Sequence, residues 1–154
     1  MTPRLARAEE AGAVRDLVRA AYAHYVPRLG REPLPMTDDY AARIAAGQAW
    51  WLPGVAVLVL VDEEGLLLDN IAVAEAARGQ GIGRALIAFA EAEARRRGHA
   101  RMWLYTNEMM GENLALYTRL GFRETHRETQ MEFRRVFMEK WLVDRDPQIA
   151  RAST

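Results

Sequence analysis

Apolar residues along the chain recur with two different spacings, and segments of each kind alternate. Residues 9–26 place apolar side chains three or four positions apart, which predicts an amphipathic helix. The same spacing returns in residues 81–98 and 111–121. Residues 36–47 predict a shorter helix, because Thr37 can cap its start and Gly47 can end it. The pattern therefore predicts four helices.

Short apolar runs between these segments predict strands. The runs at 55–61 and 66–73 are almost continuously apolar, and a tight Asp-Glu-Glu-Gly turn joins them. The other predicted strands are 3–8, 49–52, 100–106 and two within 122–142. Together these elements predict one α/β (α+β) domain over residues 1–142, with a mixed central sheet of about seven strands. Residues 143–154 are polar, and we expect a C-terminal tail there.

The loop between the strand at 66–73 and the following helix is rich in glycine. Its sequence is Arg78-Gly79-Gln80-Gly81-Ile82-Gly83. The start of a helix presents free N–H groups and about half a positive charge. Glycines without a Cβ let an anion such as a pyrophosphate approach those groups. The alternative interpretation is a turn that only requires positive φ angles.

Composition narrows the possible functions. The 21 basic and 21 acidic residues balance, so nucleic acid is not an expected partner. No apolar run is long enough to span a membrane, and the first residues lack the apolar core of a signal peptide, so we expect a cytoplasmic protein. Cysteine is absent, and the only serine, Ser153, lies in the predicted tail. Cysteine and serine nucleophiles are therefore excluded from the predicted domain.

Several nucleotide and metal motifs are also excluded. Lys140 is the only lysine, so the Gly-Lys-Ser/Thr motif of phosphate-loop NTPases is missing. The dinucleotide fingerprint fails because Arg84 stands where its third glycine belongs. The three histidines, at positions 24, 99 and 126, lack metal-ligand spacing, and no metal is expected.

The glycine loop resembles the acyl-CoA-binding motif of the GNAT superfamily of N-acetyltransferases, Arg/Gln-x-x-Gly-x-Gly/Ala. Residues 112–124 are similar to that family's second signature, an Asn, a Tyr four residues later and then Gly-Phe. The predicted element order also matches over residues 3–142. The resemblance implies a GNAT fold whose fourth and fifth strands, at 66–73 and 100–106, splay apart to admit acetyl-CoA as co-substrate.

The resemblance implies three sets of cofactor contacts. The strand segment that would pair with the pantetheine arm is Ile71, Ala72 and Val73. The loop that would hold the pyrophosphate comprises Arg78, Gly79, Gln80, Gly81, Ile82, Gly83 and Arg84. Asn113 would contact the cofactor arm, and Tyr117 would lie by the sulfur and protonate the leaving thiolate. The alternative for Tyr117 is a packed helix tyrosine with no catalytic role.

The base and the acceptor site are less marked in the sequence. Asp69, on an apolar strand, and Glu108, after the neighbouring strand, are candidates for the base, and we favour Asp69. Asn70 is expected to face the opposite side of the sheet from Asp69. Aromatic and basic residues from the least regular region could bind the acceptor: Tyr22, Tyr25, Arg28, Tyr40 and Trp50. Each could instead be a core or surface residue.

We expect an N-acetyltransferase that transfers acetyl directly from acetyl-CoA to a primary amine, without a covalent enzyme intermediate. The acceptor could be an amino acid, a polyamine, an aminoglycoside-like amine or a peptide N-terminus. Two other functions fit the same fold: a non-catalytic acyl-CoA-binding or regulatory domain, and a tRNA-acetylating toxin with an antitoxin partner. Zero net charge argues against the toxin. A homodimer is a further possibility.

Overall fold

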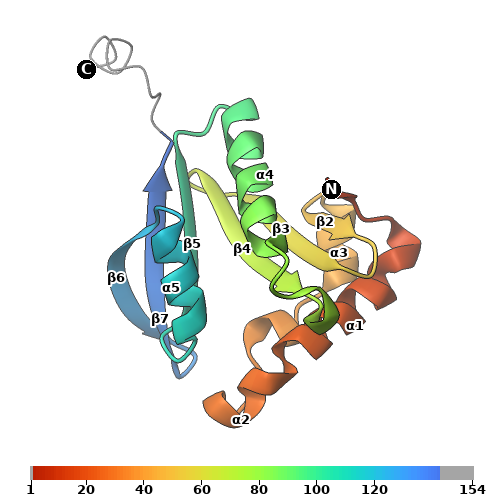
Figure 1. The fold of residues 1–154 in the computed structure, drawn as a ribbon, viewed down its shortest axis with the longest axis horizontal. Helices are drawn as coiled ribbons and strands as arrows, with labels where there is room; N and C mark the ends of the chain where they lie inside the picture. Colours follow the sequence, from red (N-terminus) through yellow and green to blue (C-terminus); the bar gives the residue numbers. More distant parts are fainter. Residues whose placement is uncertain (1, 143–154) are drawn as a thin grey trace.

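The computed structural model describes residues 2–142, so the predicted tail at 143–154 lies outside the described residues. Figure 1 shows the arrangement of the elements. The helices are α1 (Ala11–Tyr22), α2 (Val26–Leu29), α3 (Tyr40–Ala45), α4 (Ile82–Arg96) and α5 (Gly111–Arg119). The strands are β1 (Arg4–Leu5), β2 (Ala49–Leu52), β3 (Ala56–Asp62), β4 (Leu66–Val73), β5 (Arg101–Asn107), β6 (Arg123–Gln130) and β7 (Phe133–Trp141).

The strands form one seven-stranded sheet in the order β1-β2-β3-β4-β5-β7-β6, which confirms the predicted mixed sheet. β4 and β5 are the parallel neighbours, and every other adjacent pair is antiparallel. The parallel pairing joins Leu66 to Met102 and Leu67 to Trp103, and it ends there. Beyond Leu67 the two strands diverge (Figure 1), as the resemblance implied.

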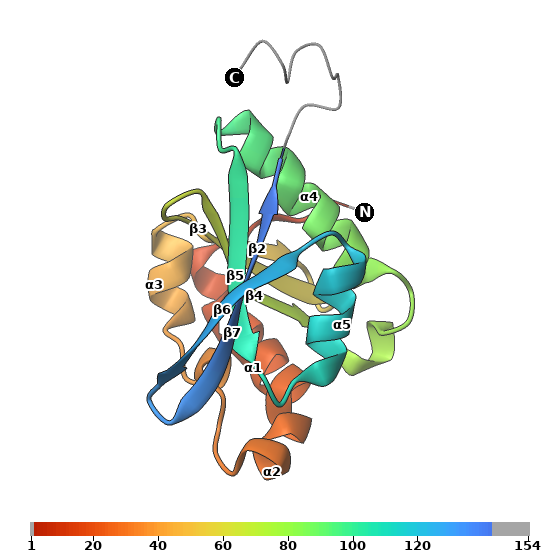
Figure 2. The same cartoon turned by 90° about the vertical axis from the view of Figure 1, so that its left-hand side faces the viewer.

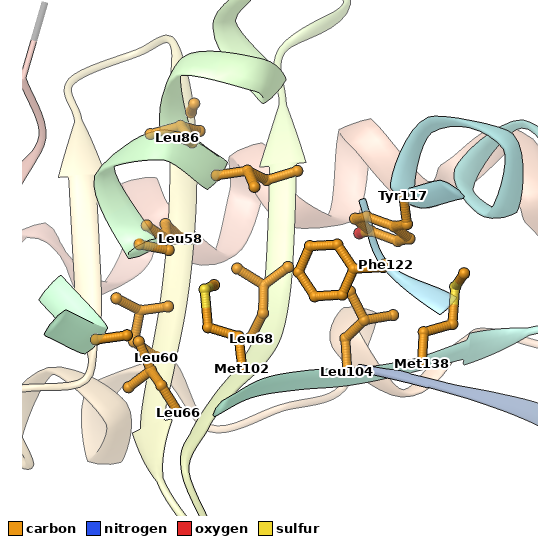
Figure 3. Packing of buried hydrophobic residues seen from close by; sticks show 14 of the residues in the cluster. Leu58, Leu60, Leu66, Leu68, Leu86, Met102, Leu104, Tyr117, Phe122 and Met138 are labelled. Atoms are coloured by element: carbon orange, nitrogen blue, oxygen red, sulfur yellow. The ribbon is translucent and has the colours of Figure 1, made fainter. Parts of the chain in front are cut away.

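Helices cover the two faces of the sheet differently. α4 and α5 lie on one face, and α1 and α3 cover the opposite face of β2, β3 and β4 (Figure 2). Leu58, Leu60, Leu66 and Leu68 pack beneath α4, while Leu104 continues the same core towards α5 (Figure 3). A second core, which includes Val14 and Val18 of α1, fills the other face. Both cores meet at β4, so this strand is fixed from both sides.

The helix predicted at 36–47 starts later than expected. Pro33 precedes a short 3₁₀ turn, Leu34–Met36, and the Thr37 hydroxyl donates to the Leu34 carbonyl 3.2 Å away. Thr37 therefore serves this turn and does not cap the helix. Asp39 caps α3 instead, because its side chain accepts a hydrogen bond from the Ala42 N–H at 3.0 Å. The late start leaves residues 30–39 as a loop beside the end of β4.

The turn between β3 and β4 supplies a test of the fold. Gly65 has a φ of +109°, and a Cβ added there would lie 2.5 Å from the carbonyl oxygen of Arg101. Gly65→Ala should lower the free energy of unfolding by at least about 2 kcal/mol, because backbone strain and a backbone clash combine. Gly12→Ala in α1 is the control, since its added Cβ meets nothing within 4 Å. Denaturant unfolding measures both, and equal stability of the two variants would contradict the prediction.

Candidate active site

A cavity of about 350 Å³ opens where β4 and β5 diverge. The loop before α3 forms one wall, with Pro33, Leu34 and Pro35. α5 forms another wall, and β7 closes a third side. The cavity therefore reaches from the α1 and α3 side of the sheet, through the split, to the α5 side. Only a split sheet permits this, because continuous hydrogen bonding between β4 and β5 would seal the passage.

A β-bulge in β4 decides which side chains enter this cavity. Asn70 pairs with Val59 and Leu68 pairs with Leu60, so Asp69 has no cross-strand partner. The extra residue shifts the alternation of side chains by one position. As a result Asp69 and Asn70 both line the cavity. The expectation that Asn70 faces away from Asp69 is wrong for this reason.

Asn70 is buried and fixed by two tyrosines. The Tyr22 hydroxyl donates to Asn70 Oδ1 at 2.7 Å, and Asn70 Nδ2 donates to the Tyr40 hydroxyl oxygen at 3.0 Å. Tyr22 also donates to the Ile71 carbonyl at 3.2 Å. Burial raises the pKa of both tyrosines, so both phenols remain protonated. Tyr22 lines the cavity. Tyr40 does not, but its hydroxyl donates to the carbonyl of Pro35, which is a lining residue.

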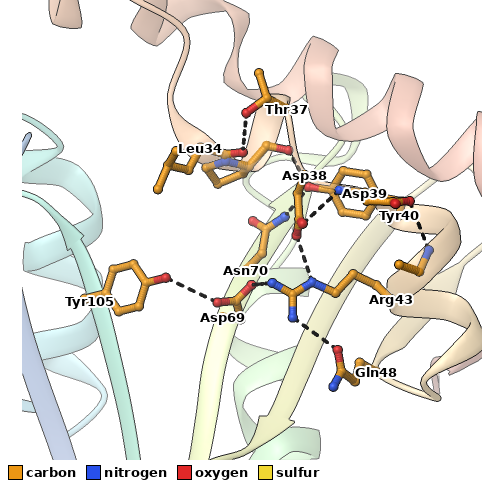
Figure 4. Close-up of polar contacts among 12 residues, drawn as sticks. Leu34, Thr37, Asp38, Asp39, Tyr40, Arg43, Gln48, Asp69, Asn70 and Tyr105 are labelled. Carbon is orange, nitrogen blue, oxygen red and sulfur yellow. Dashed lines mark hydrogen bonds and ion pairs between the residues drawn. The ribbon is translucent and has the colours of Figure 1, made fainter. Parts of the chain in front are cut away.

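Asp69 lies in a cluster of opposite charges (Figure 4). Arg43 Nη2 lies 3.2 Å from Asp69 Oδ2, and Arg43 Nε lies 2.9 Å from Asp38 Oδ2. The Tyr105 hydroxyl donates to Asp69 Oδ1 at 3.4 Å. Burial raises the pKa of Asp69 and the Asp38 carboxylate adds to that effect, while Arg43 and Tyr105 oppose it. The net direction is upward, which makes this carboxylate a better proton acceptor than an exposed aspartate.

Tyr117 lines the α5 side of the same cavity. Its ring packs edge-on against Phe122 with centroids 5.9 Å apart (Figure 3). Burial raises the pKa of its phenol, which therefore keeps its proton at neutral pH. Asn113 lies one helical turn earlier and also lines the cavity. Tyr117 is thus both packed and exposed to the cavity, and its packing positions the hydroxyl.

The glycine loop has the backbone that an anion site requires. Gly79 and Gly81 have φ angles of +79° and +77°, and Gly81 is the N-cap of α4. Gly83 lies inside the helix without a positive φ, yet a Cβ at any of these three glycines would meet nothing within 4 Å. The Arg78 side chain donates to the Ala21 carbonyl at 2.9 Å and ties the loop to α1. The N–H groups of the first turn of α4 have no partners within their own helix, so they can receive an anion.

Other cofactor candidates lie along the same path. Ile71, Ala72 and Val73 pair with β3 on one edge, and on the other edge they lie beyond the last pairing with β5. That free strand edge can take an extended partner. Gln80 and Arg84 are exposed, and Ile82, the first residue of α4, is buried in the core beneath the helix.

Besides Tyr40, four of the predicted base and acceptor residues do not line the cavity: Tyr25, Arg28, Trp50 and Glu108. The carboxylate of Glu108 pairs with Arg127 Nη1 at 3.2 Å on the surface. Arg28 pairs with Glu112 at 2.9 Å, and its guanidinium lies 5.1 Å from the Tyr25 ring. The Trp50 ring packs against Phe89 of α4, with ring centroids 4.9 Å apart. Alternation along β2 directs the next residue, Trp51, to the opposite face, towards α1. Among the lining residues of the cavity none of these four appears.

Among the lining residues that the sequence analysis did not predict are Arg43 of α3, Tyr105 of β5 and Arg135 of β7. Tyr105 carried a signal, since it lies one residue before the end of the predicted strand 100–106, which was expected to border the split. Arg43 and Arg135 carried none, because their position depends on long-range packing. Within residues 2–142 no group of three or more metal-ligating side chains could hold a metal ion. In that same range no helix combines the length and apolar character needed to cross a bilayer.

Comparison with known proteins identifies the family to which this fold belongs. A family model described as an acetyltransferase (GNAT) domain matches residues 40–124. The chain therefore belongs to the GNAT acetyltransferase family, and it is an acyltransferase. Acetyl transfer from acetyl-CoA is general to this family. No curated protein sequence matches the chain.

Solved structures share the fold at low sequence identity. PaiA N-acetyltransferase from Thermoplasma acidophilum, in complex with coenzyme A, is 15% identical with a TM-score of 0.75, covering 91% of this chain and 98% of its own. The ribosomal-protein-S18-alanine N-acetyltransferase from Escherichia coli is 21% identical with a TM-score of 0.71, covering 95% and 96%. Nourseothricin acetyltransferase is 24% identical with a TM-score of 0.51, and the match spans 62% of this chain and 58% of that protein.

Proposed function

We propose that the protein transfers an acetyl group from acetyl-CoA directly to a primary amine of a small molecule or peptide. One observation carries this proposal. Asp69 and Tyr117 line the same cavity from opposite sides of the split sheet. A carboxylate with a raised pKa and a protonated phenol are the two groups that such a transfer needs, one to accept a proton and one to donate it.

The described residues fit acetyl-CoA in three places. The open space at Gly79, Gly81 and Gly83 leaves room for a pyrophosphate against the start of α4. The free edge of β4 at Ile71–Val73 suits the extended pantetheine arm. Asn113 and Tyr117 lie where the arm would end. When bound, acetyl-CoA supplies an activated thioester at this point, and coenzyme A in the PaiA structure supports the assignment.

Two residues of the chain would then transfer protons: Asp69 would accept one and Tyr117 would donate one. An acceptor amine is protonated at neutral pH and must lose one proton before its nitrogen can attack, and Asp69 is placed to take it, directly or through water. The new N–C bond would form as the C–S bond breaks, and the nitrogen would then lose a second proton to solvent to become the amide. Tyr117 supplies a proton to the departing sulfur and recovers one from solvent. One proton is released in total for each acetyl group transferred.

The acceptor class rests on the walls of the cavity and on the family. Among solved relatives, one acts on a ribosomal-protein alanine and another is named for the small molecule nourseothricin. Both kinds of acceptor are compatible with a cavity of about 350 Å³ that opens to the surface.

The cofactor assignment can be tested with two matched glycine variants. Acetyl-CoA should raise the Tm of the wild-type protein by mass action. Gly81→Asp puts a carboxylate where the pyrophosphate belongs and should abolish the shift. Gly98→Asp at the other end of α4 is the control, because its φ of +79° and its open surroundings match those of Gly81. A Tm shift of wild-type size in Gly81→Asp would overturn the loop assignment.

Tyr117→Phe tests the proton donor. The variant keeps the ring against Phe122 and removes the hydroxyl, so kcat should fall by about 10²–10⁴ while the Tm and the acetyl-CoA Kd stay near wild type. Free thiol release with a broad panel of amines measures the rate. If Tyr117 only packs, the Tm changes slightly and kcat does not. Wild-type protein that binds acetyl-CoA but turns over no amine would instead indicate a non-catalytic acyl-CoA-binding domain.

Asp69→Asn tests the base. Activity should require ionised Asp69, so kcat/KM should fall as the pH drops through its raised pKa, and the variant should lose both rate and this acidic limb. Because the pKa of Asp69 is raised in the folded protein, ionisation of its carboxyl disfavours folding. Its contribution to the free energy of unfolding is therefore present at low pH and lost as the pH rises through that pKa. The variant therefore keeps its Tm at neutral pH. Asp16→Asn on the exposed face of α1 is the control, and a retained acidic limb in Asp69→Asn would exclude Asp69.

A further inference from the structure

Arg135 of β7 is a buried cation whose charge the protein leaves uncompensated. Its residue is 9% exposed, and it lines the cavity beside Asp69. Its Nη1 donates to the neutral side-chain oxygen of Gln130, and its guanidinium lies 4.7 Å from the Tyr105 ring centroid. Among the described residues no carboxylate forms an ion pair with it. Buried charges are normally paired, so an anionic partner from outside the chain is expected here.

The wall of the cavity formed by α3, the loop before it and β4 carries more negative than positive charge. Asp38 and Asp69 share the single guanidinium of Arg43, at 2.9 and 3.2 Å, so two carboxylates meet one cation (Figure 4). Asp38, Arg43 and Asp69 all line the cavity. The carboxylate of Glu63 also raises the pKa of Asp69, so it adds to the negative side. This wall therefore carries an excess of negative charge and attracts a cation.

Tyr105 sets the distance between the two walls. Its hydroxyl donates to Asp69, and the guanidinium of Arg135 lies over its ring in a cation–π contact. Tyr105 pairs with Phe137 and Asn107 pairs with Arg135, so Tyr105 and Arg135 are diagonal neighbours on β5 and β7. Negative and positive ends of the cavity are thus separated by about one side chain, which suits a small molecule with two opposite charges.

A second cavity of about 340 Å³ adjoins the first and shares Arg43, Asp69, Tyr105 and Arg135 with it. Its other walls include Trp103 and Phe137, which are apolar. A side chain attached between the two charged groups of a ligand would find room there.

We propose that the acceptor is a zwitterionic amine, an amino acid with a free carboxylate, whose ammonium group faces Asp69 and whose carboxylate binds Arg135. This inference rests on the proposed function and narrows it. A peptide N-terminus lacks the neighbouring carboxylate, and a polyamine would place a second cation against Arg135. Arg135 is therefore the residue that sets acceptor specificity, through a charge-assisted hydrogen bond that neither of those acceptors can make.

Matched pairs of acceptors test this on the wild-type protein. Free amino acids and the corresponding amino acid carboxamides differ only in the anionic group, and the carboxamide also represents the first residue of a peptide. With acetyl-CoA present, thiol release should show kcat/KM at least about tenfold higher for the acid of the preferred pair. Equal or faster turnover of the carboxamides would overturn the inference while leaving the proposed function intact. No turnover of any amine would overturn the proposed function itself.

Variants at two neighbouring positions assign the effect to Arg135. Arg135→Gln should lower kcat/KM for the acids more than for the carboxamides, so that the preference for acids is lost, and Arg135→Lys should restore part of it. Arg134→Gln is the control, because that side chain is exposed and bonds Thr129. An acid preference that persists in Arg135→Gln would assign the specificity elsewhere. If Arg135→Gln does not fold, the Lys variant and the wild-type pairs still decide the question.

Discussion

The site depends on one interruption in the sheet: hydrogen bonding between β4 and β5 ends after Leu67 and Trp103. Parallel strands that stayed paired would cover the edge of Ile71–Val73 and close the passage between the two faces. The pairing that remains, at Leu66 and Leu67, holds the two strands at one end, and the large core under α4 keeps them there. The divergence therefore produces both the free strand edge and the cavity, without an additional domain.

The bulge at Asp69 gives neighbouring residues different tasks. Because Asp69 lacks a cross-strand partner, its side chain can turn into the cavity beside that of Asn70. Asn70 uses both ends of its amide on Tyr22 and Tyr40, so it fixes α1 and α3 to the strand. Asp69 is held by Arg43 and Tyr105 but is left at the cavity surface. A buried neutral amide can thus provide structure while the adjacent carboxylate stays at the cavity, where the proposed proton transfer would use it.

The sequence predicted those parts of the molecule that depend on local patterns. Strand 66–73, the glycine loop and the helix with Asn113 and Tyr117 follow from spacing and from glycine. The packing of Trp50 against Phe89 could not be predicted, because alternation in a four-residue strand does not tell which face meets which helix. Glu108 is close to the site in sequence, but its partner Arg127 lies on β6, out of reach of local patterns. The bulge at Asp69 could not be predicted from the sequence either, because one extra residue shifts the pairing register of β4 with β3 without changing the apolar composition of the strand.

Long-range topology explains why the acceptor side was hardest to predict. β7 inserts between β5 and β6, so Arg135 reaches the cavity only because the last two strands return to pair with β5. Arg43 comes from α3, far away in sequence, and reaches Asp69 only because that helix packs beside β4. The proposed cofactor contacts come from β4, the following loop and two helices, whose signals are local. The proposed acceptor contacts come from the loop before α3, α3 itself, β5 and β7, whose side chains can vary without changing the fold. Under the proposal, this division lets one framework keep a common acyl donor while the charges around Asp69 and Arg135 determine the acceptor.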